Sequence, residues 1–142
     1  MQTVSNYSNQ PPSADDDSYE VTYFKSLFTD YQVQEANAAA LQTLLEIDQS
    51  QTSLLLVEMP IPEGMYSLFG AGVEDYEEFL GFVSEKTAAS NIPLITTNRR
   101  GLIPEDGWAD YSHLNSGGAQ RFSFWLGEQV AGLFPENQGD SE

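Results

Sequence analysis

The stretch 53-SLLLVEM-59 decides the fold class of this chain. It is an almost unbroken apolar run of strand length, and such runs are typical of strands buried on both faces, as in a parallel sheet. Pro60, Pro62 and Gly64 follow it and end the strand, because proline lacks the N–H that a sheet ladder needs. A second short run, 92-IPLITT-97, has the same character. We therefore expect two buried parallel strands.

Helical spacing of apolar residues precedes and follows both runs, with apolar side chains at every third or fourth position. The helices that it predicts cover residues 32–48, 73–89 and 116–134. Asp30 can cap the first helix, and Asn115 or Ser116 the last, because short polar side chains accept hydrogen bonds from the first free N–H groups of a helix. The order helix, strand, helix, strand, helix is typical of an α/β fold.

Two strands are few for such a fold. A two-stranded parallel sheet is marginal and leaves both of its edges open. Residues 19–28 interleave aromatic and polar residues, which fits either a short strand or an irregular packed segment. The chain therefore resembles the second half of a larger α/β domain. A partner half, a homodimer or a strand within residues 19–28 would complete the sheet.

Composition limits the partners that this chain can have. Its 142 residues fit one domain, and 5 Lys and Arg against 22 Asp and Glu give a net charge of −17. Nucleic acid and anionic lipid surfaces need clustered cations, so we expect neither as a partner. There is no Cys and one His, which excludes Cys nucleophiles and Cys-ligated metals. No dinucleotide, P-loop or calcium-loop motif is complete, so we expect no cofactor and no metal.

The two ends differ in composition from the rest of the chain. Residues 1–18 are rich in Ser, Asn, Gln, Pro and Asp, and residues 135–142 form an acidic tail. Such segments are typical of a disordered leader or linker, which leaves residues 19–134 as the folded part. The longest apolar run, Leu54–Val57, is far shorter than the ~20 residues that cross a bilayer. We expect no transmembrane segment and no signal peptide.

The polar loop after the second strand carries the candidate chemistry, because ligands of α/β sheets bind beyond the carboxyl ends of the strands. Asp110 and His113 lie in this loop, three residues apart. An aspartate at this distance can accept the Nδ1–H of the imidazole and leave Nε2 as a general base. Alternatively, the two residues only shape the start of the last helix. Asp-x-x-His is common by chance, so the spacing alone favours this structural role.

Four neighbouring residues are candidates for substrate binding. Arg99 and Arg100 directly follow the second strand, where a guanidinium can hold an anionic group or pair with the acidic loop. Trp108 and Tyr111 flank the Asp-x-x-His sequence. Their rings can line an acyl or sugar pocket, or simply cover the end of the sheet.

A family resemblance changes the weight of these alternatives. The stretch 108-WADYSHLNSGGA-119 resembles the last conserved block of SGNH (GDSL-type) hydrolases, and more narrowly their envelope acyltransferase-like branch. The strand that ends at Pro60 is similar to the strand-then-proline segment of that branch. The resemblance covers about residues 30–134 and implies a flavodoxin-like, three-layer α/β/α fold, here a partial one with few parallel strands. It also implies a cell-envelope or extracellular location.

The resemblance implies an active site that this sequence carries only in part. By this carry-over, His113 is the general base of a Ser–His–Asp triad and Asp110 orients it. The family's nucleophile lies in a Gly-Asp-Ser motif after the first strand, and no such unit precedes residue 19. Gly139–Ser141 spells this motif, but no strand comes before it. No Ser has the context of a nucleophile elbow either.

Two functions remain in competition at this point. In the first, the chain is the C-terminal part of an SGNH-like esterase or O-acyltransferase acting on acyl esters. It then holds the triad Asp and His without the Ser, and is inactive alone. In the second, it is a non-catalytic acidic α/β module that binds a partner protein or a carbohydrate.

Overall fold

Two short parallel strands lie at the centre of the computed structural model, which describes residues 19–50, 53–98 and 101–133. Strand β1 (Leu56–Val57) pairs with β2 (Leu94–Ile95), and Leu56 lies opposite Leu94. The N–H of Leu56 donates to the carbonyl of Pro93 over 3.0 Å, and the N–H of Glu58 donates to the carbonyl of Ile95 over 2.8 Å. Both strands are shorter than the apolar runs that predicted them.

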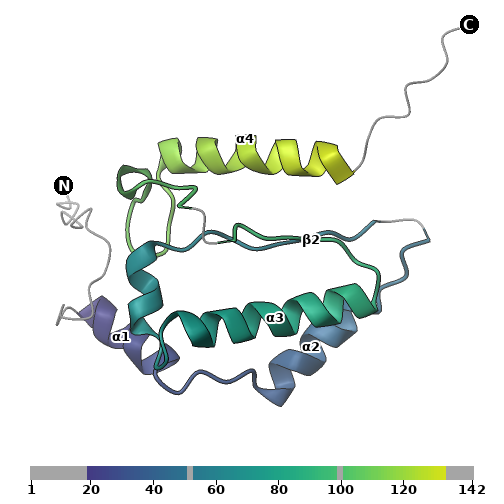
Figure 1. Cartoon of the computed structure of the whole chain (residues 1–142), viewed down its shortest axis with the longest axis horizontal. Helices are drawn as coiled ribbons and strands as arrows, with labels where there is room; N and C mark the ends of the chain where they lie inside the picture. Colours follow the sequence, from purple (N-terminus) through teal and green to yellow (C-terminus); the bar gives the residue numbers. More distant parts are fainter. Residues whose placement is uncertain (1–18, 51–52, 99–100, 134–142) are drawn as a thin grey trace, which may run out of the picture.

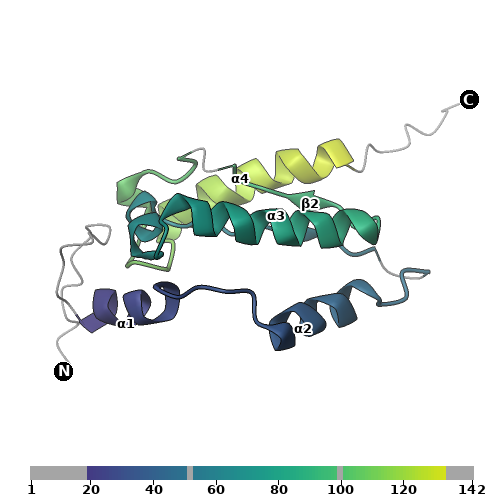
Figure 2. The same cartoon turned by 60° about the horizontal axis from the view of Figure 1, so that its bottom comes forward.

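Helices make up most of the regular structure (Figure 1). The α-helices are α1 (Tyr19–Phe28), α2 (Glu35–Leu45), α3 (Val73–Ala89) and α4 (Ser116–Leu133), and the 3₁₀ helices are η1 (Glu63–Leu68) and η2 (Glu105–Gly107). Helix α3 has the bounds that its apolar spacing predicts. The strand pair lies between α3 and α4 in Figure 1, and α2 lies on the far side of α3 in both Figure 1 and Figure 2.

Residues 19–28 form helix α1, so the strand that would have completed the sheet is absent there and this alternative is wrong. The reason is the spacing of the buried side chains. Val21, Phe24 and Phe28 recur at intervals of three and four residues, which places them on one face of a helix. Val21 is fully buried against Met65 and Leu68 of η1, with Phe24 and Phe28 beside it. Phe24 and Phe28 therefore cover η1 and do not extend the sheet.

The first predicted helix begins later and ends earlier than its pattern predicts. Helix α2 starts at Glu35, with Gln34 as its N-cap residue, so Asp30 is not the cap. Tyr31 explains the delay. Its ring lies 5.6 Å from the ring of Phe69 and 5.9 Å from that of Phe79, between ring centroids. These contacts hold the chain before α2 against the core in a non-helical conformation.

Apolar side chains gather in three clusters around the strand ends. The first joins α1 to η1 and includes Tyr111, the second joins η1 to α3, and the third joins the loop after β2 to α4. Val57 of β1 packs against this third cluster, which ties α4 to the sheet. The chain is thus a mostly helical protein with a small parallel sheet. This agrees with the predicted α/β class in its general sense. No helix in the described residues has the length and apolarity needed to span a membrane.

Candidate functional site

The Asp-x-x-His sequence forms a tight closed turn. Trp108 and Leu114 form an isolated antiparallel bridge, and the N–H of Ala109 donates to the carbonyl of His113 over 2.8 Å. Inside this turn, Asp110 Oδ1 accepts hydrogen bonds from the N–H groups of Ser112 (2.8 Å) and His113 (2.9 Å). An Asp side chain that binds the backbone two residues further on is a common turn device. The local sequence therefore dictates this geometry.

The same carboxylate binds the imidazole. Nδ1 of His113 lies 2.9 Å from Oδ1 and 2.9 Å from Oδ2 of Asp110. Partial burial of Asp110 favours its neutral form, but the hydrogen bonds from Ser112 and from the side chain and backbone of His113 outweigh it and lower the pKa of Asp110. The acid is therefore ionised at neutral pH and favours the Nδ1–H form of the neutral ring. Sequence reasoning predicted this pairing, and the turn brings the two side chains together.

Nε2 of His113 is available for a further reactant. The side chain of His113 is 75% exposed, and among the described residues only its Nδ1 takes part in hydrogen bonds. The hydroxyl oxygen of Ser112 lies 3.2 Å from Nδ1. This hydroxyl lies beside Nδ1, the nitrogen that faces the carboxylate of Asp110. A triad nucleophile must bind Nε2 instead, so Ser112 does not occupy that position.

Helix α1 forms one wall of a cavity beside the Asp-x-x-His turn. The sequence analysis did not predict this cavity. The cavity has a volume of about 210 Å³, and Asp110–His113 line its other side. The aromatic side chains that α1 contributes are Tyr19, Tyr23 and Phe24. Tyr19 and Tyr23 are 84% and 50% exposed and four residues apart, so both lie on one face of α1. That spacing was the available signal, but the segment was interpreted as either a short strand or an irregular packed segment.

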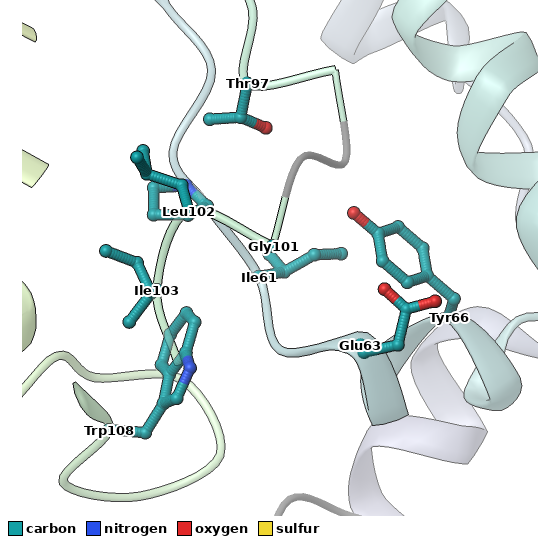
Figure 3. Close-up of a pocket in the computed structure, with 9 residues that line it drawn as sticks. Ile61, Glu63, Tyr66, Thr97, Gly101, Leu102, Ile103 and Trp108 are labelled. Carbon is teal, nitrogen blue, oxygen red and sulfur yellow. The ribbon is translucent and has the colours of Figure 1, made fainter. Parts of the chain in front are cut away.

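A second, smaller cavity lies beyond the carboxyl ends of β1 and β2, where α/β proteins bind ligands. Its volume is about 60 Å³. Figure 3 shows Tyr66 and Glu63 on one side of it and Trp108 and Ile103 on the other. Thr97, which comes shortly after the end of β2, also lines this cavity.

The predicted binding residues are therefore divided. Trp108 lines the small cavity and is buried in the cluster with Ile103 and Phe122. Tyr111 is also buried, in the cluster of α1 and η1, and lines the cavity at His113. Each of the two rings packs in an apolar cluster and also lines a cavity. Arg99 and Arg100 lie outside the described residues.

Sequence reasoning missed a buried carboxylate at the end of β1. Glu58 is buried, and its Oε1 accepts a hydrogen bond from the hydroxyl of Tyr76 on α3, while its Oε2 accepts one from the N–H of Thr97 after β2. A buried acid needs such partners, because an unpaired one is very unfavourable. Burial, followed by the hydrogen bond from Tyr76 to Glu58 and its charge, raises the pKa of Tyr76. The signal was the single acid in the apolar run 53–59.

Asn115 and two glycines fix the turn on α4. Oδ1 of Asn115 accepts hydrogen bonds from the N–H groups of Gly117 (2.9 Å) and Gly118 (3.0 Å), which confirms Asn115 as the cap. Its Nδ2 donates to the carbonyl of Asp106 over 2.6 Å. A Cβ on Gly118 would lie 2.0 Å from the carbonyl oxygen of Gly107. The backbones of η2 and α4 thus meet at a distance that only glycine allows.

The candidate site therefore consists of an oriented, exposed imidazole beside a cavity walled by α1. In the described residues, no three His, Cys, Asp or Glu side chains form a group that could hold a metal ion. Comparison with known proteins adds no assignment. No protein-family model, curated protein or solved structure matches this chain.

Proposed function

We propose that this chain supplies the His–Asp pair of an SGNH-like esterase or O-acyltransferase, whose serine nucleophile comes from another segment or subunit. The observation that supports the proposal is the position of His113. Its Nδ1 lies 2.9 Å from both oxygens of Asp110, and its side chain is exposed. This is the orientation that a triad histidine needs.

The proposed chemistry has two proton transfers through Nε2 of His113. Nε2 takes the proton of the serine hydroxyl as the serine oxygen bonds to the acyl carbon of an ester. The protonated ring then gives that proton to the leaving alcohol, and an acyl-enzyme remains. Water or a second hydroxyl repeats the sequence and releases the acyl group. The carboxylate of Asp110 stabilises the imidazolium in both steps and is not itself protonated.

The flavodoxin-like three-layer arrangement belongs to the same proposal. Among the described residues the sheet has only β1 and β2, and a polypeptide that carries the serine would add strands to it. The acceptor of the acyl group would approach through the cavity at His113, between the turn and α1.

The test is fluorophosphonate labelling of the protein in extracts of its natural host, followed by mass-spectrometric mapping of the modified residue. Tagged wild-type, His113→Ala and Ser112→Ala chains are compared. We expect a labelled serine in a polypeptide that copurifies with the wild-type chain and with Ser112→Ala, and loss of the label with His113→Ala. Labelling that persists in His113→Ala would refute the general base. A labelled serine within this chain would refute the divided site.

A non-catalytic acidic binding module is the second candidate, and one observation favours it. Oδ1 of Asp110 accepts two backbone hydrogen bonds in the turn, which gives this residue a structural role without catalysis. This candidate predicts a sharply melting monomer or closed dimer that reacts with no acyl ester. Sedimentation velocity with thermal unfolding distinguishes it from a half-domain, whose open sheet edges favour self-association.

A further inference from the structure

The largest of the cavities described here lies between the connection that precedes α2, α2 itself and α3. Its volume is about 610 Å³. Six of the side chains that line it carry an aromatic ring or a carboxylate: Tyr31, Phe79, Phe82, Glu35, Asp75 and Glu78. We call it the acidic aromatic cavity. It shares no lining residue with the cavity at His113 or with the one at Trp108.

Aromatic rings form a corner in this cavity. The rings of Tyr31 and Phe79 stand at 87° to each other, with centroids 5.9 Å apart. The face of an aromatic ring is electronegative and attracts cations. Phe82, on the next turn of α3, already has a cation on its ring, because Nζ of Lys86 lies 5.6 Å from its centroid. A ring of this wall thus already binds a cation, which the chain itself supplies.

The carboxylates that line the cavity form no ion pair with the described residues, although Nζ of Lys86 lies 5.6 Å from the centroid of the Phe82 ring. Glu35 and Glu78 are exposed, and neither forms an ion pair with a described residue. Asp75 accepts a hydrogen bond from the N–H of Ala71 over 2.8 Å, which leaves its charge unpaired as well. No Lys or Arg is among the described residues that line the cavity.

The carboxylates of this cavity do not form a metal site. No three acidic side chains in the described part of the chain are close enough together to hold a metal ion. An organic cation does not need such a group of ligands, because its charge is spread over a larger surface. Its apolar surface can then rest on the rings while its charge faces the acids, which is how aromatic cages bind quaternary ammonium groups.

From these observations we propose that the acidic aromatic cavity binds an organic cation, an ammonium or guanidinium group. Two sources present this chemistry: a free amine, and a Lys or Arg side chain of another protein. The proposal does not depend on the function of His113.

The test uses ¹H–¹⁵N correlation spectra of the whole chain at constant ionic strength. Choline is the probe for a free amine, and N-acetylarginine methylamide for a protein side chain. 3,3-Dimethylbutan-1-ol, the neutral isostere of choline, is the control. We expect saturable shifts of the amides of residues 31–38 and 75–82 with at least one cation and none with the alcohol. The probe that saturates at lower concentration identifies the source. Equal shifts with the alcohol, or no saturation by either cation, would overturn the proposal.

Variants separate the cavity from the general acidity of the chain. Phe82→Leu should weaken binding by about 2- to 30-fold, the range of a cation–π contact. Glu78→Gln should weaken it by about 1.5- to 5-fold, the range of an exposed ion pair. Glu128→Gln removes the same charge from the exposed surface of α4 and should leave binding unchanged. Equal weakening by Glu128→Gln and Glu78→Gln would show non-specific attraction and refute the site. Thermal unfolding verifies that each variant is folded.

Discussion

At the scale of single residues, Asp110 combines a structural and an electrostatic role. Its carboxylate closes the turn through two backbone N–H groups and orients the ring of His113. The first role needs only an acceptor oxygen, and the second needs a charge. A substitution that keeps the acceptor oxygen of the side chain but removes its negative charge therefore distinguishes the two roles.

Asp110→Asn should make the stability of the protein less dependent on pH. The hydrogen bonds lower the pKa of Asp110 in the folded state, so the folded chain binds this proton more weakly than the unfolded chain. The stabilisation is present above the unfolded-state pKa of about 3.9 and is lost as pH falls through the folded pKa. Urea unfolding of both proteins between pH 3 and 7 measures it. A free-energy difference that stays constant with pH would contradict the prediction.

His113 offers a direct spectroscopic reading of the same pair. It is the one histidine in the chain, so imidazole ¹⁵N signals report it without ambiguity. We expect the neutral ring to be in the Nδ1–H form in the wild-type chain, because Nδ1 faces the carboxylate, and to lose this preference in Asp110→Ala. An Nε2–H form in the wild type would argue against His113 as a base.

Tyr76→Phe should destabilise the fold by about 1–3 kcal/mol, the penalty for leaving a buried acceptor without its donor. Glu58 is buried and loses the hydroxyl of Tyr76. Tyr23→Phe is the matched control, because Tyr23 is half exposed and should change stability little. Because the pKa of Tyr76 is raised, stability also falls as pH rises above about 10 in the wild type. That alkaline loss should be smaller in Tyr76→Phe, as urea unfolding can measure.

At the scale of elements, the contact of η2 with α4 determines where the Asp-x-x-His turn lies. The turn is tied to α4 by Asn115 and by the close approach of Gly107 and Gly118. The two glycines of 117–118 are therefore not equivalent. Only Gly118 would place a Cβ against backbone, whereas Gly117 would meet a side-chain oxygen at 3.3 Å.

Gly118→Ala should destabilise the fold by about 1–3 kcal/mol, because its Cβ would overlap the carbonyl of Gly107 and force the backbones apart. Gly127→Ala is the control on the same helix. Nothing lies within 4 Å of its Cβ position, so it should stabilise α4 by about 0.5–1 kcal/mol. Thermal and urea unfolding measure both. Similar effects of the two substitutions would mean that the close approach is absent in solution.

At the scale of the whole molecule, charge repulsion opposes folding. A net charge of −17 on a small chain favours expansion, and salt screens that repulsion. The melting temperature should therefore rise between about 20 and 500 mM NaCl, where the Debye length falls from about 20 Å to about 4 Å. Differential scanning calorimetry measures this. A melting temperature that falls with NaCl would show that attractive ion pairs dominate instead.

Local sequence patterns predicted those helices and strands that are determined by their own residues. Helix α3 has the predicted bounds because its apolar stripe and its acidic first turn lie within it. The strands were predicted in place and order but as buried on both faces, whereas Leu56, Val57 and Leu94 are only half-buried. Of the two predicted caps of α4, Asn115 is the one that caps it. The pairing of Asp110 with His113 was also predictable, because three residues of turn suffice to bring the side chains together.

Helix α1 was missed although its spacing was visible in the sequence. Its interleaved ring and polar residues suggested a short strand or an irregular packed segment, whereas Val21, Phe24 and Phe28 follow helical spacing and pack against η1. The later start of α2, by contrast, could not be predicted, since Tyr31 is held by rings from distant segments. Contacts between segments that are distant in the chain cannot be predicted from the spacing of residues within one element.

The amino-acid sequence by itself determined the acidity, the α/β order, the capped last helix and the oriented imidazole. Each of these depends on composition or on residues within a few positions of one another. The tertiary structure alone decided that α1 walls the cavity at His113 and that Glu58 is paired by Tyr76 and Thr97. It also decided that rings and carboxylates from two helices share a cavity. Those features depend on side chains that only packing brings together, because burial and hydrogen bonding act between neighbours in space.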